Sequence, residues 1–118
     1  MIGNTDWAVP IFHNIKLIKK LDSLSSPIPF VVPYDFDDAG AVNTSYAIPF
    51  EELPNKHVTE RYYLGFWRTI EEINTVPDQF RANSQKINDL IETFLYKSNF
   101  YRKEMLVFIK QFYKMIDN

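Results

Sequence analysis

The chain has 118 residues and a mass of 14.0 kDa, which is the size of one ordinary domain. Its net charge of -2 and pI of about 5.6 exclude the strongly basic surface that nucleic-acid binding usually needs, so we expect no nucleic-acid partner. The lack of cysteine excludes disulfides and thiolate metal sites, and no apolar run approaches the roughly 18 residues of a membrane span. We expect no membrane partner; the compartment stays open, with the cytoplasm as the default expectation.

The first third of the chain predicts a polar loop followed by a β-hairpin. The loop begins with Gly3-Asn4-Thr5-Asp6-Trp7, because glycine, asparagine and aspartate interrupt regular structure. Residues 15–21 and 28–34 are rich in apolar, β-branched and aromatic side chains, and residues 23–27 between them have the composition of a turn. Two prolines in the second segment remove backbone donors, so this strand should be short or lie at an edge.

The remaining two-thirds predict a long loop and then helices. Residues 35–54 show neither helical nor strand periodicity, which favours a long ordered loop. Three helices are expected, over residues 57–74, over 77–95 and over 101–116, because apolar residues recur on one face of each, at spacings of three, four and seven in the second. The third helix is expected to pack antiparallel to the second. We therefore predict an α+β fold in which a short hairpin and a long loop pack on about three helices, within a single domain of residues 1–118.

Three polar side chains flank the predicted hairpin and form the candidate site. If residues 15–21 pair with residues 28–34, Asn14 just before the first strand and Asp35 just after the second lie at the same end. Asp6 precedes them in the polar loop. Carboxylate and amide oxygens are the ligands that Mg²⁺ prefers, and Mg²⁺ is commonly held by one or two carboxylates together with substrate phosphates. The sequence therefore predicts a site for a metal-bound phosphate.

The same residues resemble a motif set of the protein-kinase-like superfamily. Asn4 and Asp6, then Asn14, then Asp35-Phe36-Asp37 are similar in order to its catalytic loop, metal-binding asparagine and second metal motif, with most similarity to the HipA-type and spore-coat CotH-type kinases. The resemblance implies that Asp6 is catalytic, orienting or deprotonating the acceptor hydroxyl. It implies that Asn14 and Asp35 bind the cofactors Mg²⁺ and ATP, and that Asp37 is a further metal ligand.

A less specific resemblance links the chain to a group of uncharacterised bacterial proteins. They share the Pro33-Tyr34-Asp35-Phe36-Asp37 element, a following Tyr-Ala-x-Pro like Tyr46–Pro49 and a Glu-Arg helix like Glu60-Arg61. This likeness implies a kinase carboxy-terminal lobe, the carboxy-terminal part of a larger fold, whose partner is a missing amino-terminal lobe. The sequence has no glycine-rich phosphate loop and no lysine in a kinase-type strand, so we expect a fragment or degenerate relative that is inactive alone.

A structural interpretation of the same residues stays open beside the kinase-like one. Asp6, Asn14 and their neighbours are also typical turn and cap residues, and Asp38 is best explained in that way. His13 and His57 lack the spacing of a zinc site and favour surface or hydrogen-bonding roles. The runner-up is therefore a non-catalytic binding or scaffold module, whose exposed aromatic surface would bind a protein partner or a second copy in a homodimer.

Overall fold

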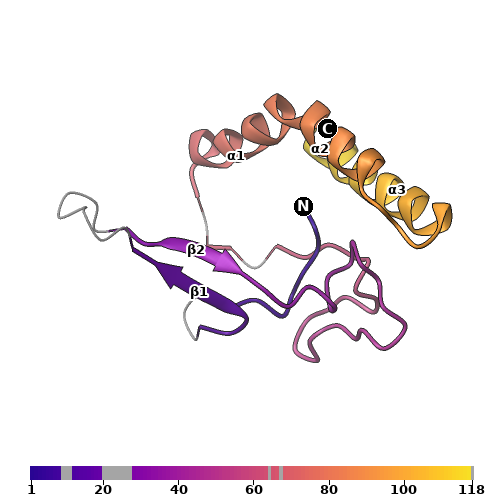
Figure 1. The fold of residues 1–118 in the computed structure, drawn as a ribbon. Coiled ribbons are helices and arrows are strands. Elements are labelled where there is room, and N and C mark those ends of the chain that lie inside the picture. The colour runs from indigo at the N-terminus through magenta and orange to yellow at the C-terminus, as the bar shows by residue number, and fades with distance from the viewer. Residues whose placement is uncertain (9–11, 20–27, 64, 67, 118) are drawn as a thin grey trace. The chain divides into compact units, whose positions relative to one another are not determined.

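The computed structural model describes residues 1–8, 12–19, 28–63, 65–66 and 68–117. In chain order, the described residues form two strands and then three helices, so the fold is α+β as predicted (Figure 1). They group into two compact units. The hairpin unit comprises Gly3–Tyr62, and the helical unit comprises Met1–Ile2 with Tyr63–Asn118. Whether the two behave as the single domain expected from the sequence stays a prediction.

The predicted hairpin forms, with shorter strands than the sequence pattern suggests. Strand β1 (Ile15–Ile18) pairs antiparallel with β2 (Phe30–Pro33), and Ile15 lies opposite Pro33. The β-branched and aromatic residues of both strands suit this extended pairing. The predicted turn at residues 23–27 lies outside the described residues.

A small apolar core and a set of turns hold the rest of the hairpin unit. Its buried side chains are Ile15, Ala39 and Val58, which are 4%, 0% and 5% exposed. Residues 35–54 contain turns and no helix or strand, which confirms the predicted long loop. This loop is tied to the start of the chain, because the Gly40 N–H donates to the Gly3 carbonyl at 2.9 Å. Gly3 has a φ of 67°, a conformation that glycine adopts without steric cost.

The first helix, α1, spans Ile70–Ala82, so the predicted helix over residues 57–74 is wrong for most of its length. Its start is fixed by a capping box: the Thr69 side chain accepts from the Glu72 N–H at 3.2 Å, and the Glu72 carboxylate accepts from the Thr69 N–H at 3.0 Å. Before it, Val58 is buried in the core of the hairpin unit, and the described residues up to Thr69 are turns or irregular. Burial of Val58 therefore overrides the helical spacing of the apolar residues.

The predicted second helix over residues 77–95 is wrong at its beginning. Pro77 lies inside α1, and a new helix, α2 (Ser84–Thr93), begins only after Asn83. Asn83 ends α1 because its Nδ2 donates to the Gln79 carbonyl at 2.8 Å and its backbone N–H bonds to the same turn. Of the apolar face predicted for this helix, Ile91 is buried, whereas Leu90 and Leu95 are 66% and 93% exposed.

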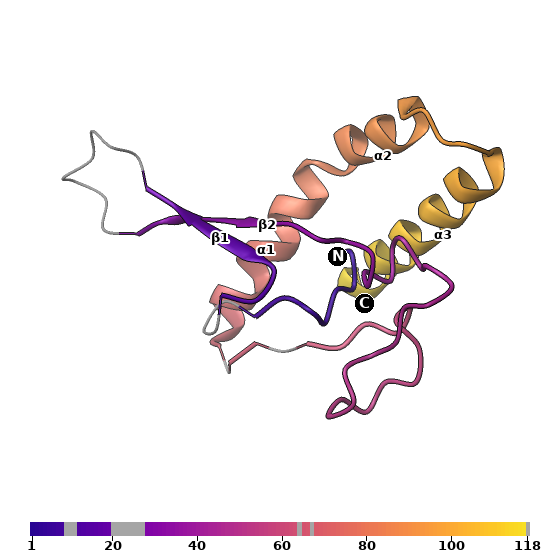
Figure 2. The same cartoon turned by 60° about the horizontal axis from the view of Figure 1, so that its bottom comes forward.

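The third predicted helix is confirmed as α3 (Asn99–Ile116), which runs back along α2 (Figures 1 and 2). Three of its side chains, Phe108, Ile109 and Phe112, are buried. The Phe112 ring meets the edge of Phe80 at 4.9 Å between ring centres, and the Tyr113 hydroxyl donates to the Phe80 carbonyl at 3.1 Å. These contacts join the last turns of α3 to α1. No helix in the described part of the chain has both the length and the apolar character that crossing a bilayer requires.

The capping box gives a direct test of what starts α1. Thr69→Ala removes the side-chain oxygen that accepts from the Glu72 N–H, so we expect the free energy of unfolding of the helical unit to fall by about 1 kcal/mol. Denaturant unfolding followed by helical circular dichroism measures the change. The matched control is Thr75→Ala in the same helix, where the hydroxyl donates to the Glu71 carbonyl and alanine is the better helix former. An equal loss in both variants would contradict the capping role.

Candidate functional site

The candidate site lies at the end of the hairpin where β1 begins and β2 ends. Asn14 immediately precedes β1, and Asp35 follows β2 by two positions. The Tyr34 N–H donates to the Asn14 carbonyl at 3.0 Å and continues the ladder of the hairpin to this end. Asn14 and Asp35 are therefore neighbours at one end of the hairpin, as the pairing argument predicts.

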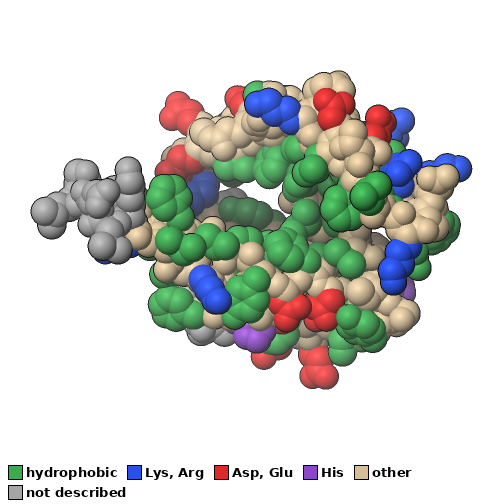
Figure 3. Space-filling model, in the orientation of Figure 1, with side chains coloured by type: hydrophobic (Ala, Val, Ile, Leu, Met, Phe, Trp, Pro, Cys, Tyr) green, Lys and Arg blue, Asp and Glu red, His purple; other side chains and the backbone are tan. Residues whose placement is uncertain are grey.

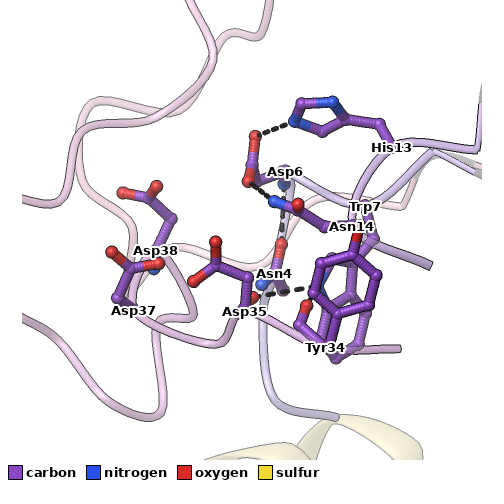
Figure 4. A network of polar contacts seen from close by, with 9 residues as sticks. All are labelled: Asn4, Asp6, Trp7, His13, Asn14, Tyr34, Asp35, Asp37 and Asp38. Carbon is purple, nitrogen blue, oxygen red and sulfur yellow. Dashed lines mark hydrogen bonds and ion pairs between the residues drawn. The ribbon is translucent and has the colours of Figure 1, made fainter. Parts of the chain in front are cut away.

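The opening loop brings Asp6 to the same place. The backbones of Ala8 and His13 form an isolated antiparallel bridge, with hydrogen bonds of 3.2 and 3.0 Å. Beyond this bridge, the Asn14 Nδ2 donates to Asp6 Oδ2, and His13 Nε2 lies 3.1 Å from Asp6 Oδ1 (Figure 4). Both oxygens of the Asp6 carboxylate thus have a partner. The Asp6 backbone is fixed as well, because its N–H donates to Asn4 Oδ1 at 2.7 Å.

Trp7 fixes the backbone on the other side of the site. Its Nε1 donates to the carbonyls of Tyr34 and Asp35, at 2.9 and 3.1 Å. Its ring also meets the Phe36 ring edge-on at 4.9 Å between centres. The tryptophan therefore attaches the opening loop to the chain that leaves β2, and it holds Asp35 beside Asp6 and Asn14.

Two of the candidate residues occupy a backbone conformation that most amino acids avoid. Asn14 and Asp35 have φ values of 50° and 58°. Asparagine and aspartate tolerate this left-handed region better than other non-glycine residues, because their short polar side chains bond locally. The strained conformation supplies a structural reason for these residue types. It also occurs in clusters at functional sites, so it is compatible with either interpretation.

Three carboxylates follow one another on the chain that leaves β2, and they repel one another. The pKa of Asp35 is raised, first by a hydrogen bond with Asp37 and the negative charge of Asp37, and then by partial desolvation and the charges of Asp6 and Asp38. The pKa of Asp38 is raised by burial and by the charges of Asp37 and Asp6. Figure 4 shows the carboxyl groups of Asp35, Asp37 and Asp38 gathered on one side of Asp6 and Asn14. The site is therefore rich in negative charge.

Asp37 differs from its two neighbours because its pKa is lowered. The causes are first the hydrogen bond with Asp35, and then the Tyr46 hydroxyl and backbone N–H groups, which outweigh partial desolvation. The Tyr46 hydroxyl lies 3.1 Å from Asp37 Oδ2, and the Asp38 N–H lies 3.2 Å from Asp37 Oδ1. A Thr44 hydroxyl on the Asp37 carbonyl, at 3.1 Å, holds the same turn.

The carboxylate and amide oxygens of the site suit a hard cation that also binds an anion such as phosphate. Asp35 and Asp37 offer adjacent carboxylates, and Asn14 keeps its amide oxygen because its nitrogen donates to Asp6. Among the described residues, no group of three His, Asp or Glu side chains has the arrangement of a metal centre, so this set depends on the amide oxygen. The buried Asn4 Nδ2 has no hydrogen-bond partner among the described residues and is a free donor beside these acceptors.

Sequence reasoning placed Asp6, Asn14, Asp35 and Asp37 in the candidate site, and the structure brings all four to one end of the hairpin. It missed the roles of Trp7 and Tyr46, which hold the backbone and a carboxylate of the site from a distance in sequence. Both residues belong to sequence elements described above, but those elements assign neither of them a part in the site. No family model, curated protein or solved structure matches the chain.

The charge crowding at Asp35 predicts a pH-dependent gain of stability in Asp35→Asn. Because the pKa of Asp35 is raised in the folded protein, the ionised form costs stability at neutral pH and costs nothing below the ordinary pKa. Asparagine removes the charge and still tolerates a φ of 58°. We expect a higher melting temperature for the variant at pH 7, with the gain disappearing as the pH falls through the pKa of Asp35. A gain of equal size at every pH would show that charge is not its cause.

Proposed function

We propose that residues 3–38 carry the magnesium- and nucleotide-binding side of a kinase-like phosphotransfer site, within a fold related to a kinase carboxy-terminal lobe. The proposed ligands of the metal are Asn14 and Asp35, with Asp37 as a further ligand, and ATP is the proposed nucleotide. Asp6 is the proposed catalytic residue. The observation that carries the proposal is the contact between the Asn14 amide and the Asp6 carboxylate, beside Asp35, at one end of the hairpin.

The ionisation pattern of the site supports a place for a divalent cation. The hydrogen bond with Asp37 and the negative charges of Asp37, Asp6 and Asp38 raise the pKa of Asp35, and a cation bound beside Asp35 and Asp37 would relieve this repulsion. A bound magnesium ion would supply neutralisation of the phosphate charges. The free Asn4 Nδ2 is a donor suited to a phosphate oxygen.

The surroundings of Asp6 support its proposed part in orienting an acceptor hydroxyl. Its carboxylate is fixed in direction by Asn14 on one oxygen and by His13 on the other, and its side chain is 32% exposed. A carboxylate held in this way can accept a hydrogen bond from an incoming hydroxyl group without losing its orientation.

The remaining elements of phosphotransfer would come from an amino-terminal lobe or another protein partner. A kinase reaction also needs a loop that covers the phosphates and a lysine that pairs with them, and the printed sequence has neither pattern. We therefore expect this chain to bind magnesium and ATP weakly and to have negligible turnover by itself.

Titration with Mg²⁺ and ATP, followed by amide NMR of the whole chain, tests the site. We expect chemical-shift changes at Asn4–Ala8, His13–Asn14 and Asp35–Gly40. The critical variant is Asn14→Ala, which removes the amide oxygen proposed as a metal ligand. Its matched control is Asn43→Ala, because Asn43 has a φ of 51°, close to the 50° of Asn14, and the backbone cost of alanine is the same. We expect Asn14→Ala to lose the response and Asn43→Ala to retain it.

Two results would contradict parts of this proposal. Equal responses in Asn14→Ala and Asn43→Ala would remove Asn14 from the metal site. Measurable ATP hydrolysis or autophosphorylation by the chain alone, abolished by Asp35→Ala, would contradict the expected lack of turnover. No response at any of the three segments would reject the site itself.

The second candidate function, a non-catalytic binding module, is favoured by apolar surface on the helical unit. A groove of about 600 Å³ there is lined by apolar side chains that include Ile73, Val76, Phe80 and Phe112. Beside it in sequence, Phe66 and Ile70 are 80% and 77% exposed. Exposed apolar patches of this kind mark protein interaction sites. Self-association that rises with concentration, with no response to Mg²⁺ and ATP, would favour this function.

A further inference from the structure

The two free edges of the hairpin differ in their ability to bind another strand. The Tyr34 N–H donates to the Asn14 carbonyl, so Asn14 and Tyr34 form a hydrogen-bonded pair. Such pairs alternate along an antiparallel ladder, and the next ones are therefore Lys16 with Val32 and Ile18 with Phe30. The residues between them direct their backbone groups outward, to the free edges.

The outer edge of β2 is closed by proline. The outward positions on this strand are Val31, Pro33 and, by the same alternation, Pro29 immediately before it. Proline has no N–H group, so two of these three positions have no backbone donor to offer another strand. Proline in this position is a known protection of sheet edges against pairing.

The outer edge of β1 keeps accessible donors along its second half. Leu17 and, by the same alternation, Lys19 are exposed and direct their N–H groups outward, and within the described ranges no backbone group bonds to them, whereas Ile15 at the start of the strand is buried. The same edge already accepts one backbone partner further back, because His13 forms its antiparallel bridge with Ala8 there. The opening loop does not continue this bridge as a strand, because the Asp6 N–H bonds to the Asn4 side chain.

The hairpin also exposes apolar side chains on both faces, and a strand added beside β1 would adjoin those of β1. Leu17 and Val31 on one face are 39% and 46% exposed, and Ile18 and Phe30 on the other are 51% and 69% exposed. Figure 3 shows hydrophobic side chains gathered on the visible face of the hairpin, with a positively charged side chain among them. A two-stranded hairpin is marginally stable in water, so a third strand would stabilise it.

The charge of the hairpin identifies the chemistry of the partner. Both charged residues of the described hairpin, Lys16 and Lys19, are lysines on β1 or directly after it, and both are exposed. Two copies of β1 paired with each other would bring these lysines together, which is unfavourable. An acidic strand would instead place opposite charges across the new ladder. Because Asp6 and Asp35 lie at the Asn14 end, the acidic part of the partner belongs at the Lys19 end.

We propose that the free edge of β1 binds an extended acidic peptide segment of a protein partner as a third, antiparallel strand. Lys16 and Lys19 are three positions apart, so the preferred segment has two acidic residues separated by two apolar β-branched ones. The backbone of Leu17 and Lys19 supplies the affinity and the two lysines supply the preference for acid. This binding edge is independent of the magnesium and nucleotide site.

Titration of the whole chain with the blocked peptide Thr-Glu-Val-Val-Glu-Val-Thr tests the proposal by amide NMR and hydrogen exchange. We expect shifts and slower exchange at Leu17 and Lys19. Leu17→Pro removes an outward N–H that the hairpin does not use, and its matched control, Val31→Pro, removes the outward N–H of the residue opposite. We expect affinity to fall about tenfold or more in Leu17→Pro, since a pairing bond is lost and the ring blocks close approach, and to stay unchanged in Val31→Pro.

A charge exchange tests the lysines without changing the backbone. The double variant Lys16→Glu with Lys19→Glu should lose the acidic peptide and bind the peptide Thr-Lys-Val-Val-Lys-Val-Thr instead. Equal losses in Leu17→Pro and Val31→Pro, or no exchange of preference in the double variant, would overturn the proposal. So would slowed exchange at the same amides that depends on protein concentration without peptide, because the partner would then be a second copy of the chain.

Discussion

The candidate site depends on the pairing of Asn14 with Tyr34, which closes the hairpin at the end where its strands meet the loops. This pair places the residue before β1 and the residues after β2 at the same end of the hairpin. Both Asn14 and Asp35 then turn into the left-handed region, which directs the chain away from the sheet on either side. The two hydrogen bonds from Trp7 to the carbonyls of Tyr34 and Asp35 hold the opening loop against this end of the hairpin. The backbone contact of Asn14 with Tyr34 and the two hydrogen bonds of Trp7 thus bring together side chains of three separate segments.

The electrostatic character of the site follows from this closure. Turning the chain at Asp35 brings Asp37 and Asp38 back toward Asp6, so the groups that shift the pKa of Asp35 are all carboxyl groups apart from desolvation. Fixed negative charges that raise one another's pKa cost stability, and such a cost is common where a protein binds a ligand of opposite charge. The contact between Asn14 and Asp6 supports the proposed function independently of these pKa shifts.

The sequence correctly predicted the elements that depend on local patterns. It failed where the burial of a side chain determined the secondary structure. The hairpin, the long loop and α3 have strong local patterns, and the meeting of Asn14 with Asp35 follows from strand pairing. The helix expected over residues 57–74 failed because Val58 is buried among loops of the hairpin unit, which no spacing rule reveals. The break at Asn83 depends on one side chain that competes for a carbonyl of the preceding turn. Trp7 bonds to Tyr34, 27 positions away, and Tyr46 bonds to Asp37, 9 positions away. No local sequence pattern predicts contacts over these separations.

The hydrogen bond from Tyr46 to Asp37 gives the site an optical reporter of its own. The pKa of the Tyr46 phenol is raised, first by its bond to Asp37 and then by desolvation and the negative charge of that carboxylate. A phenol that ionises beside a negative group reports the charge of that group through its ultraviolet absorption. Any ligand that neutralised Asp37 would make the phenolate easier to form, so the difference between the alkaline absorbance titrations of the chain and of Tyr46→Phe would record the charge state of the site without a label.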